Sequence, residues 1–233
     1  MRNGPSKAVK SQKGFTVIEL LVVIAIIALL GSVALFYANA HKKLYQPDDQ
    51  SLQLVDMLQE ARQRALTQRR TMRVEINLST NMARLYDENL DATTSSDDVL
   101  IKGLTLFATA NVRMDTRPSE IGYNPPELMT VPNAVFRTSV YTPSVAQTVC
   151  TIRFLSNGQA VDAGTNATGA GAVPTGLTLH IWSPNKTNPL QSDIARSITV
   201  LGATGVIRLW EFNHQSTATN KWQDSRRSST YGG

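Results

Sequence analysis

Few side chains in this sequence have the type and spacing that a catalytic or metal-binding site needs. Cys150 is the only cysteine, which excludes an intrachain disulfide and a cysteine-rich metal site. The three histidines, His41, His180 and His214, are scattered, which makes a zinc site improbable. There is no nucleophile elbow, phosphate loop or His-Glu-x-x-His pattern. The sequence therefore predicts no enzyme, no cofactor and no bound metal.

Glu19 is the ionisable residue whose position most needs a chemical explanation. It directly precedes an uncharged run from Leu20 to Ala38. A carboxylate just inside an apolar helix costs about 2 to 3 kcal/mol on insertion scales, so its default interpretation is functional and requires a partner. We therefore expect Glu19 to take part in binding.

The apolar run predicts a membrane segment. As a helix it spans about 28 Å at ~1.5 Å per residue, close to the thickness of the bilayer core. A buried core helix would normally have a polar face, and this run has none. Residues 1–14, the leader, hold four cations and no acid, so they supply most of the chain's net charge of +5. By the positive-inside bias, the leader stays in the cytoplasm and the rest of the chain crosses the membrane.

Two ordinary alternatives remain for this segment. A cleaved secretory signal would use Ala38-Asn39-Ala40 as its small-x-small site and release a β domain with no assembly role, although the apolar run is long for such a signal. An uncleaved signal anchor would also suit the run. Neither alternative explains Glu19.

The residues from Lys13 to Leu20, Lys-Gly-Phe-Thr-Val-Ile-Glu-Leu, resemble the processing site of type IV pilins and type II secretion pseudopilins. The resemblance implies that a prepilin peptidase cuts after Gly14 and that Phe15 becomes the methylated mature N-terminus. Glu19 would then be the fifth mature residue and would pair with the α-ammonium of a neighbouring subunit during assembly. The implied partners are other pilins or pseudopilins, the prepilin peptidase, an inner-membrane assembly platform and, before assembly, the membrane.

Pro47 predicts an interruption or a kink of the helix, because proline removes a backbone donor. Helical periodicity resumes after it. Apolar residues then fall on one face of a helix from about Gln50 to Gln68, and this amphipathic half should pack on a sheet. With the membrane part it forms one long helix. The predicted domains are a leader at 1–14, an assembly helix at 15–40, an amphipathic helix at 41–70, a β domain at 71–212 and a flexible tail at 213–233.

Alternating patterns and turn signals predict the strands of the β domain. The predicted strands are Met72–Ile76, Met82–Tyr86, Val99–Phe107, Val149–Phe154, Leu177–Trp182, Ser197–Leu201 and Val206–Phe212. Five prolines between Arg117 and Pro143 predict irregular excursions or edge strands. The residues after Phe212 have no apolar pattern and are expected to be poorly ordered. The fold class is therefore α+β, with a long N-terminal helix packed on an antiparallel β domain.

Within the family, this layout most resembles the H-type minor pseudopilin and related minor pilins. Short segments carry this finer resemblance, among them Ile152–Gly158 and Arg196–Val200. It implies a non-catalytic subunit of a type II secretion pseudopilus, held in the inner membrane by one span with its C-terminal domain in the periplasm. The alternative is a minor type IV pilin involved in pilus assembly, adhesion or DNA uptake.

Other candidate sites have simpler structural interpretations. A basic cluster could bind DNA, but no aromatic residue lies between Tyr45 and Tyr86 for stacking, so a solvated face is favoured. The acidic pairs Asp48-Asp49 and Asp97-Asp98 lack the alternating ligand spacing of a calcium loop. Cys150 fits a buried small hydrophobe. The arginines of the basic cluster are Arg62, Arg64, Arg69, Arg70 and Arg73, and a weaker basic candidate in the tail comprises Lys221, Trp222, Arg226 and Arg227.

Overall fold

The computed structural model divides the chain into two compact units, Met1–Lys42 and Lys43–Gly233. Between residues 36 and 44 the backbone is described without side chains. The described residues are 15–88, 98–115, 117–118, 121–122, 124–127, 136–141, 147–184 and 195–225.

The helix α1 (Val17–Gln68) contributes an apolar segment to the first unit. Residues Val17–Leu35 are long and apolar enough to cross a membrane, and none of this stretch is buried by the described chain. Every large apolar side chain from Phe15 to Leu35 is exposed, with fractions between 46% and 86%. A helix that is apolar all round and uncovered by its own chain requires lipid or other protein around it.

Pro47 does not interrupt α1, which continues through it to Gln68. A proline inside a helix costs about 3 kcal/mol, so other contacts must offset the loss. Pro47 is buried, Asp48 pairs with Arg196 at 2.8 Å, and the Gln50 side-chain oxygen accepts a hydrogen bond from the Phe107 amide at 2.7 Å. The predicted interruption is therefore wrong, because the burial of Pro47 and the tertiary contacts of Asp48 and Gln50 directly after it hold the backbone helical.

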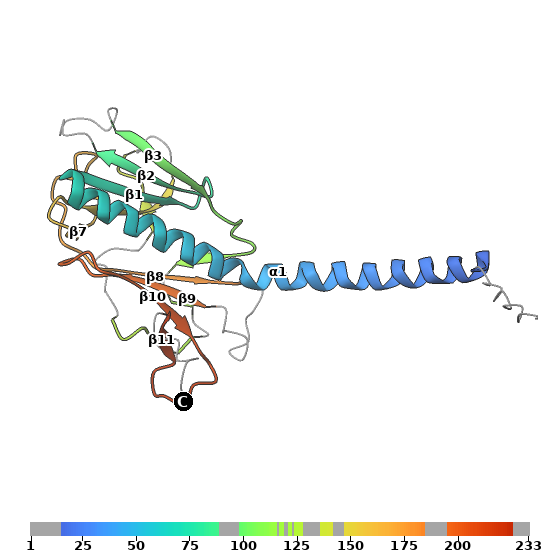
Figure 1. Ribbon diagram of the computed structural model, residues 1–233. Helices are drawn as coiled ribbons and strands as arrows, with labels where there is room; N and C mark the ends of the chain where they lie inside the picture. Colours follow the sequence, from blue (N-terminus) through green and yellow to red (C-terminus); the bar gives the residue numbers. More distant parts are fainter. Residues whose placement is uncertain are drawn as a thin grey trace, which may run out of the picture. The chain divides into compact units, whose positions relative to one another are not determined.

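Two antiparallel sheets form the second unit together with the C-terminal part of α1 (Figure 1). Sheet A has the order β3-β2-β1-β6-β5, with β7 also paired to β6, and sheet B has the order β11-β10-β9-β8-β4. The strands of sheet A are β1 (Thr71–Asn77), β2 (Met82–Glu88), β3 (Val99–Thr105), β5 (Arg137–Thr138), β6 (Thr148–Phe154) and β7 (Ala160–Val161). Those of sheet B are β4 (Arg113–Asp115), β8 (Leu177–Trp182), β9 (Arg196–Val200), β10 (Ile207–Phe212) and β11 (Trp222–Asp224).

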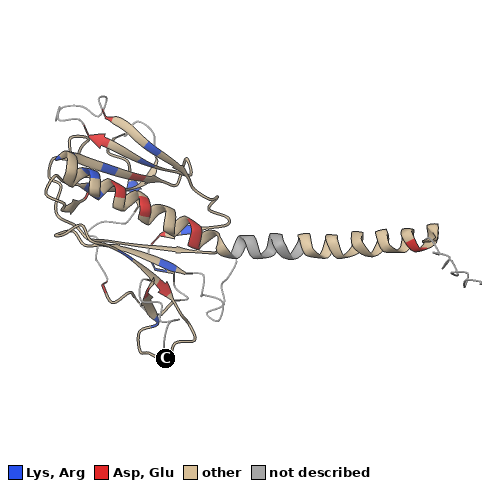
Figure 2. Cartoon of the chain, viewed as in Figure 1, with Lys and Arg blue, Asp and Glu red and all other residues tan. Residues whose placement is uncertain are grey.

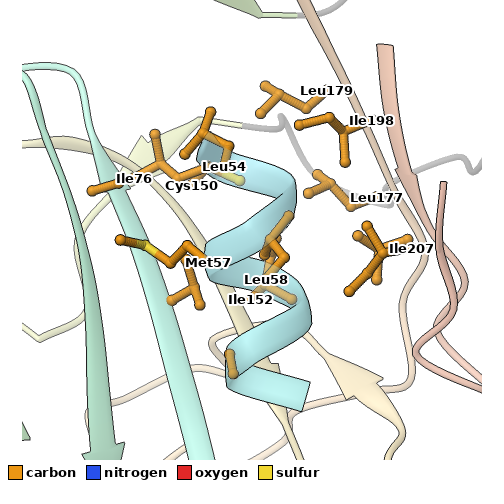
Figure 3. Close-up of a cluster of buried hydrophobic side chains, with 14 of the residues drawn as sticks. Leu54, Met57, Leu58, Ile76, Cys150, Ile152, Leu177, Leu179, Ile198 and Ile207 are labelled. Atoms are coloured by element: carbon orange, nitrogen blue, oxygen red, sulfur yellow. The ribbon is translucent and has the colours of Figure 1, made fainter. Parts of the chain in front are cut away.

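The core lies where the amphipathic part of α1 packs between the two sheets. Figure 3 shows Leu54, Met57 and Leu58 of α1 between side chains of sheet A and side chains of sheet B. These helix residues are fully buried. The sheet residues labelled around them are Ile76, Cys150 and Ile152 on sheet A and Leu177, Leu179, Ile198 and Ile207 on sheet B. The α+β fold class predicted from the sequence is confirmed.

The predicted disorder from residue 213 onward is wrong for its described part, because β11 pairs with β10 and Trp222 is only 3% exposed. A single tryptophan supplies the burial here, so no alternating pattern marks this strand. Arg226 and Arg227 lie outside the described residues. In the described part of the proline-rich region, β5 is a short edge strand, as the prolines indicated.

Candidate functional site

A capping box starts α1. Thr16 directly precedes the helix, and its hydroxyl accepts a hydrogen bond from the Glu19 amide at 3.3 Å. The Glu19 carboxylate in turn accepts hydrogen bonds from the Thr16 amide and the Thr16 hydroxyl, both at 2.8 Å. These reciprocal bonds satisfy backbone donors that every helix N-terminus otherwise leaves open. The sequence analysis interpreted Glu19 as a binding residue and missed this capping role. The Thr-x-x-Glu spacing is the sequence signal for it.

Glu19 is also placed to meet a cation. Phe15 is 86% exposed and lies immediately before the cap, one helical turn from the carboxylate. The positive end of the helix dipole favours a negative charge at this position. If the chain were cut before Phe15, a new α-ammonium would stand beside this carboxylate. Gly14 lies outside the described residues, so the proposed cleavage point has no structural description.

The helix that follows offers an apolar surface with one charge. The segment is largely tan in Figure 2, and Glu19 is the charged residue within Val17–Leu35. The Ser32 hydroxyl donates to the Leu29 carbonyl at 2.7 Å, so its hydrogen bond is satisfied within the helix. A surface of this kind can bury itself in lipid or against similar helices. Among the described side chains from Phe15 to Leu35, the polar ones are Thr16, Glu19 and Ser32.

The basic cluster is used largely for contacts within the chain. Arg62 donates to the Thr204 carbonyl at 3.1 Å, and Arg64 pairs with Glu60 at 2.9 Å. Arg73 is 3% exposed. Arg70 pairs with Asp87 at 3.1 Å. These contacts direct the arginines toward different partners, so they do not form a common face for phosphates.

Arg73 is the centre of a buried ionic network on the face of sheet A that points away from α1. Its guanidinium lies 3.6 Å from the Tyr141 ring centroid and 4.6 Å from that of Tyr86. It donates to Asp98 at 2.7 Å and to Glu88 at 3.4 Å. Burial raises the pKa of Tyr141, so this phenol stays neutral. The network joins the end of β2 to the start of β3, and sequence patterns did not indicate it.

The acidic pairs do not form a cation site in the described chain. Asp48 pairs with Arg196, and the Asp49 carboxylate accepts a hydrogen bond from the Gln53 side chain at 3.0 Å. Asp98 belongs to the Arg73 network, and Asp97 lies outside the described residues. Among the residues that the structure describes, no three acidic, histidine or cysteine side chains come together as metal ligands.

The remaining described candidates, Cys150, Lys221 and Trp222, lie in the second unit. Cys150 on β6 is 1% exposed, as predicted for a small hydrophobe, and burial raises the pKa of its thiol to about 12. Lys221 donates to the His214 carbonyl at 2.7 Å, and its neighbour Trp222 is buried. Neither position offers a reactive group or a nucleic-acid surface.

Comparisons with known proteins point to the N-terminus. The family described as the prokaryotic N-terminal methylation motif matches residues 9–35. The matched residues include Phe15, Glu19 and the apolar helix up to Leu35, and the remainder of the chain lies outside the match. Among solved structures, the minor pseudopilin EpsH from the type 2 secretion system of Vibrio cholerae matches with a TM-score of 0.39 and 12% identity, over 71% of this chain and 97% of that chain. A search of curated proteins finds no match.

Proposed function

We propose that this chain, which carries the N-terminal methylation motif of prokaryotic pilins and pseudopilins, is a minor pseudopilin of a type II secretion pseudopilus. A prepilin peptidase cuts the precursor after Gly14, and the new N-terminus at Phe15 is methylated. The observation that supports this most is a coincidence of position. The matched motif, the capping box and the exposed apolar helix all fall between residues 9 and 35.

The proposed assembly step exchanges one partner of Glu19 for another. In the single chain, the carboxylate is satisfied by the Thr16 amide and hydroxyl. Among packed apolar helices, a neighbouring subunit's α-ammonium on its own Phe15 adds a charged donor. Two opposite charges brought together recover much of the cost of removing each from water. Glu19 thereby sets the register between helices that are otherwise uniformly apolar.

The proposed location follows from the same segment. Before assembly the precursor spans the inner membrane once, because Val17–Leu35 suits a bilayer and four cations precede it. The leader then lies in the cytoplasm and the β domain in the periplasm. The prepilin peptidase and the assembly platform are the membrane partners that this location requires.

A minor type IV pilin is the alternative, because the same motif starts both kinds of subunit. DNA binding within that alternative is not favoured, since Arg62, Arg64, Arg70 and Arg73 engage groups of their own chain. Salt-dependent DNA retention by the processed protein would favour the pilin alternative. Recovery of the chain in a secretion pseudopilus would favour the proposal.

Two substitutions test whether Glu19 acts through a neighbouring subunit or only through its own cap. Glu19→Ala removes both roles, whereas Thr16→Ala weakens the cap by about 1 kcal/mol and keeps the carboxylate. We expect Glu19→Ala to be cleaved normally and to be recovered in sheared fibres at less than about one tenth of the wild-type amount, given a loss of more than 1.4 kcal/mol. Thr16→Ala should retain most incorporation. Equal defects in the two variants would reduce Glu19 to a helix cap, and normal incorporation of Glu19→Ala would remove it from assembly.

A further inference from the structure

A second, smaller apolar cluster lies on the face of sheet B that points away from α1. Trp210, Phe212 and Trp222 form it together with Ile121 and Ala195. Its outer layer includes β11, the edge strand of sheet B, which pairs with β10 over only three residues. The Phe212 and Trp222 rings meet edge to face at 5.2 Å. Trp222 is therefore the main side chain by which this edge strand is attached.

Beneath Trp222 lies a histidine that the fold buries without a hydrogen bond. His180 on β8 is 2% exposed, and its ring meets that of Trp222 edge to face at 5.6 Å. Neither ring nitrogen has a hydrogen-bond partner among the described residues. Ser197 on β9 lies directly opposite His180 on β8. Its hydroxyl is also buried and has no hydrogen-bond partner among the described residues. In contrast, the nearby Trp210 indole donates to the Thr199 hydroxyl at 2.9 Å.

The charged groups near His180 include one guanidinium and two carboxylates. Burial, and after it the charge of Arg117, lowers the pKa of His180, and the Arg117 guanidinium donates to the Gly122 carbonyl at 3.1 Å. Asp115 on β4 is the cross-strand neighbour of His180, and Asp224 lies on β11. Neither carboxylate hydrogen bonds the ring. A proton on His180 would thus be buried against an indole and near a guanidinium, on a ring that has no hydrogen bond to either carboxylate.

We propose that β11 is an acid-sensitive cover of sheet B, released when His180 takes up a proton. Protonation makes the buried ring a desolvated, unpaired cation, and the least costly relief is for water to reach it. Movement of Trp222 and the three-residue β11 admits that water, whereas the longer β8 and β9 remain paired. Release uncovers Phe212, Trp210 and the edge of β10, so acid converts a covered sheet edge into an exposed apolar one.

The size of the effect follows from the two protonation equilibria. An exposed histidine has a pKa near 6.5. Burial is the larger cause and the charge of Arg117 the smaller one, and together they lower the pKa of His180 to about 4. A proton that binds the open state more tightly shifts the opening equilibrium by linkage. Between pH 7.5 and pH 5.0, this difference favours opening by about 30-fold.

Hydrogen exchange of the full-length processed protein in detergent micelles tests the proposal. The readout is the protection factor of peptides covering residues 213–225, corrected for intrinsic exchange rates and referenced to residues 71–88 of β1 and β2. We expect wild-type protection at 213–225 to fall about 30-fold more than the reference between pH 7.5 and pH 5.0.

Three variants decide the cause. His180→Leu and His180→Gln both remove the titrating group, one with an apolar and one with a polar side chain, so either folded variant suffices. Both should lose the pH-dependent change, whereas His214→Gln, a histidine substitution in the same C-terminal region, should retain it. The proposal is overturned if wild-type protection at 213–225 does not fall relative to the reference. It is equally overturned if the fall persists in either His180 variant.

Discussion

The helix α1 contributes to two regions with opposite surroundings. From Val17 to Leu35 none of it is buried by the described chain, whereas Leu54, Met57 and Leu58 are fully buried between two sheets. The first region has apolar residues on every side, and the second has them on one face. Within the described chain, only the second region buries its apolar side chains against other residues. The first must obtain this burial from lipid or from other subunits, and substitutions in the two regions should therefore affect different measurements.

Polar groups follow the same division. In the β domain, Arg73 is enclosed by Asp98, Glu88 and two tyrosine rings. In the first region, Glu19 is exposed, and among the described residues its carboxylate accepts hydrogen bonds from Thr16. The buried network contributes to the stability of one chain, while the exposed carboxylate remains available to a second chain.

Replacement of Gly14 by a bulky residue should have the largest effect and should be confined to the first region. We expect Gly14→Phe to keep its leader, because the side chain would block the peptidase, with the mature form reduced to below detection. The β domain should unfold at the same denaturant concentration as in the wild-type protein. A mature chain that starts at Phe15 in this variant would contradict the assignment of the cleavage site.

Loss of the buried network should break the second region alone. Removing one partner of a buried ion pair costs about 3 to 5 kcal/mol, so Arg73→Ala should lower the free energy of unfolding by that amount. The matched control is Arg70→Ala, whose pair with Asp87 is 44% exposed on the arginine side and should contribute less than about 1 kcal/mol. Denaturant titration of the full chain in micelles measures both. Similar losses in the two variants would contradict the burial argument, and a processing defect in Arg73→Ala would contradict the division between regions.

Acid should weaken the second region through His180. Its folded pKa of about 4 lies below the ordinary 6.5, so the unfolded chain binds the proton more readily. This contribution to stability is complete above pH 6.5 and is lost as the pH falls toward 4, by about 3 kcal/mol at most. The quantity to measure is the difference in unfolding free energy between wild type and His180→Leu at each pH, because carboxylates contribute equally to both. A difference that does not change with pH would refute the linkage.

The smallest predicted effect concerns the end of α1. Arg69 follows the last helical residue with a φ of 54°, the left-handed region that glycine adopts most easily. Arg69→Gly should therefore raise the free energy of unfolding by about 0.5 to 1 kcal/mol. Thermal unfolding followed by circular dichroism would detect it as a small increase in Tm. A decrease in Tm would mean that the Arg69 side chain makes a larger contribution than its backbone conformation costs.

Features that depend on local pattern could be predicted from the sequence. The strand at β1 and the helix face of Leu54 and Leu58 follow from their periodicity. β11 could not be predicted, because one buried tryptophan rather than an alternating run attaches it. Continuity through Pro47 depends on Arg196 and Phe107, which are far away in the sequence. At the candidate site, the binding role of Glu19 stays a prediction, and the sequence analysis missed its hydrogen bonds with Thr16 although the Thr-x-x-Glu spacing signals them.

The identity of the mature N-terminus tests the central claim most directly. Mass spectrometry of the protein recovered from its native membrane would identify the first peptide. The account predicts a peptide that starts at methylated Phe15. A start at His41, or an intact leader that begins at Met1, would contradict pilin-type processing and leave a secreted or anchored β domain without the proposed assembly role.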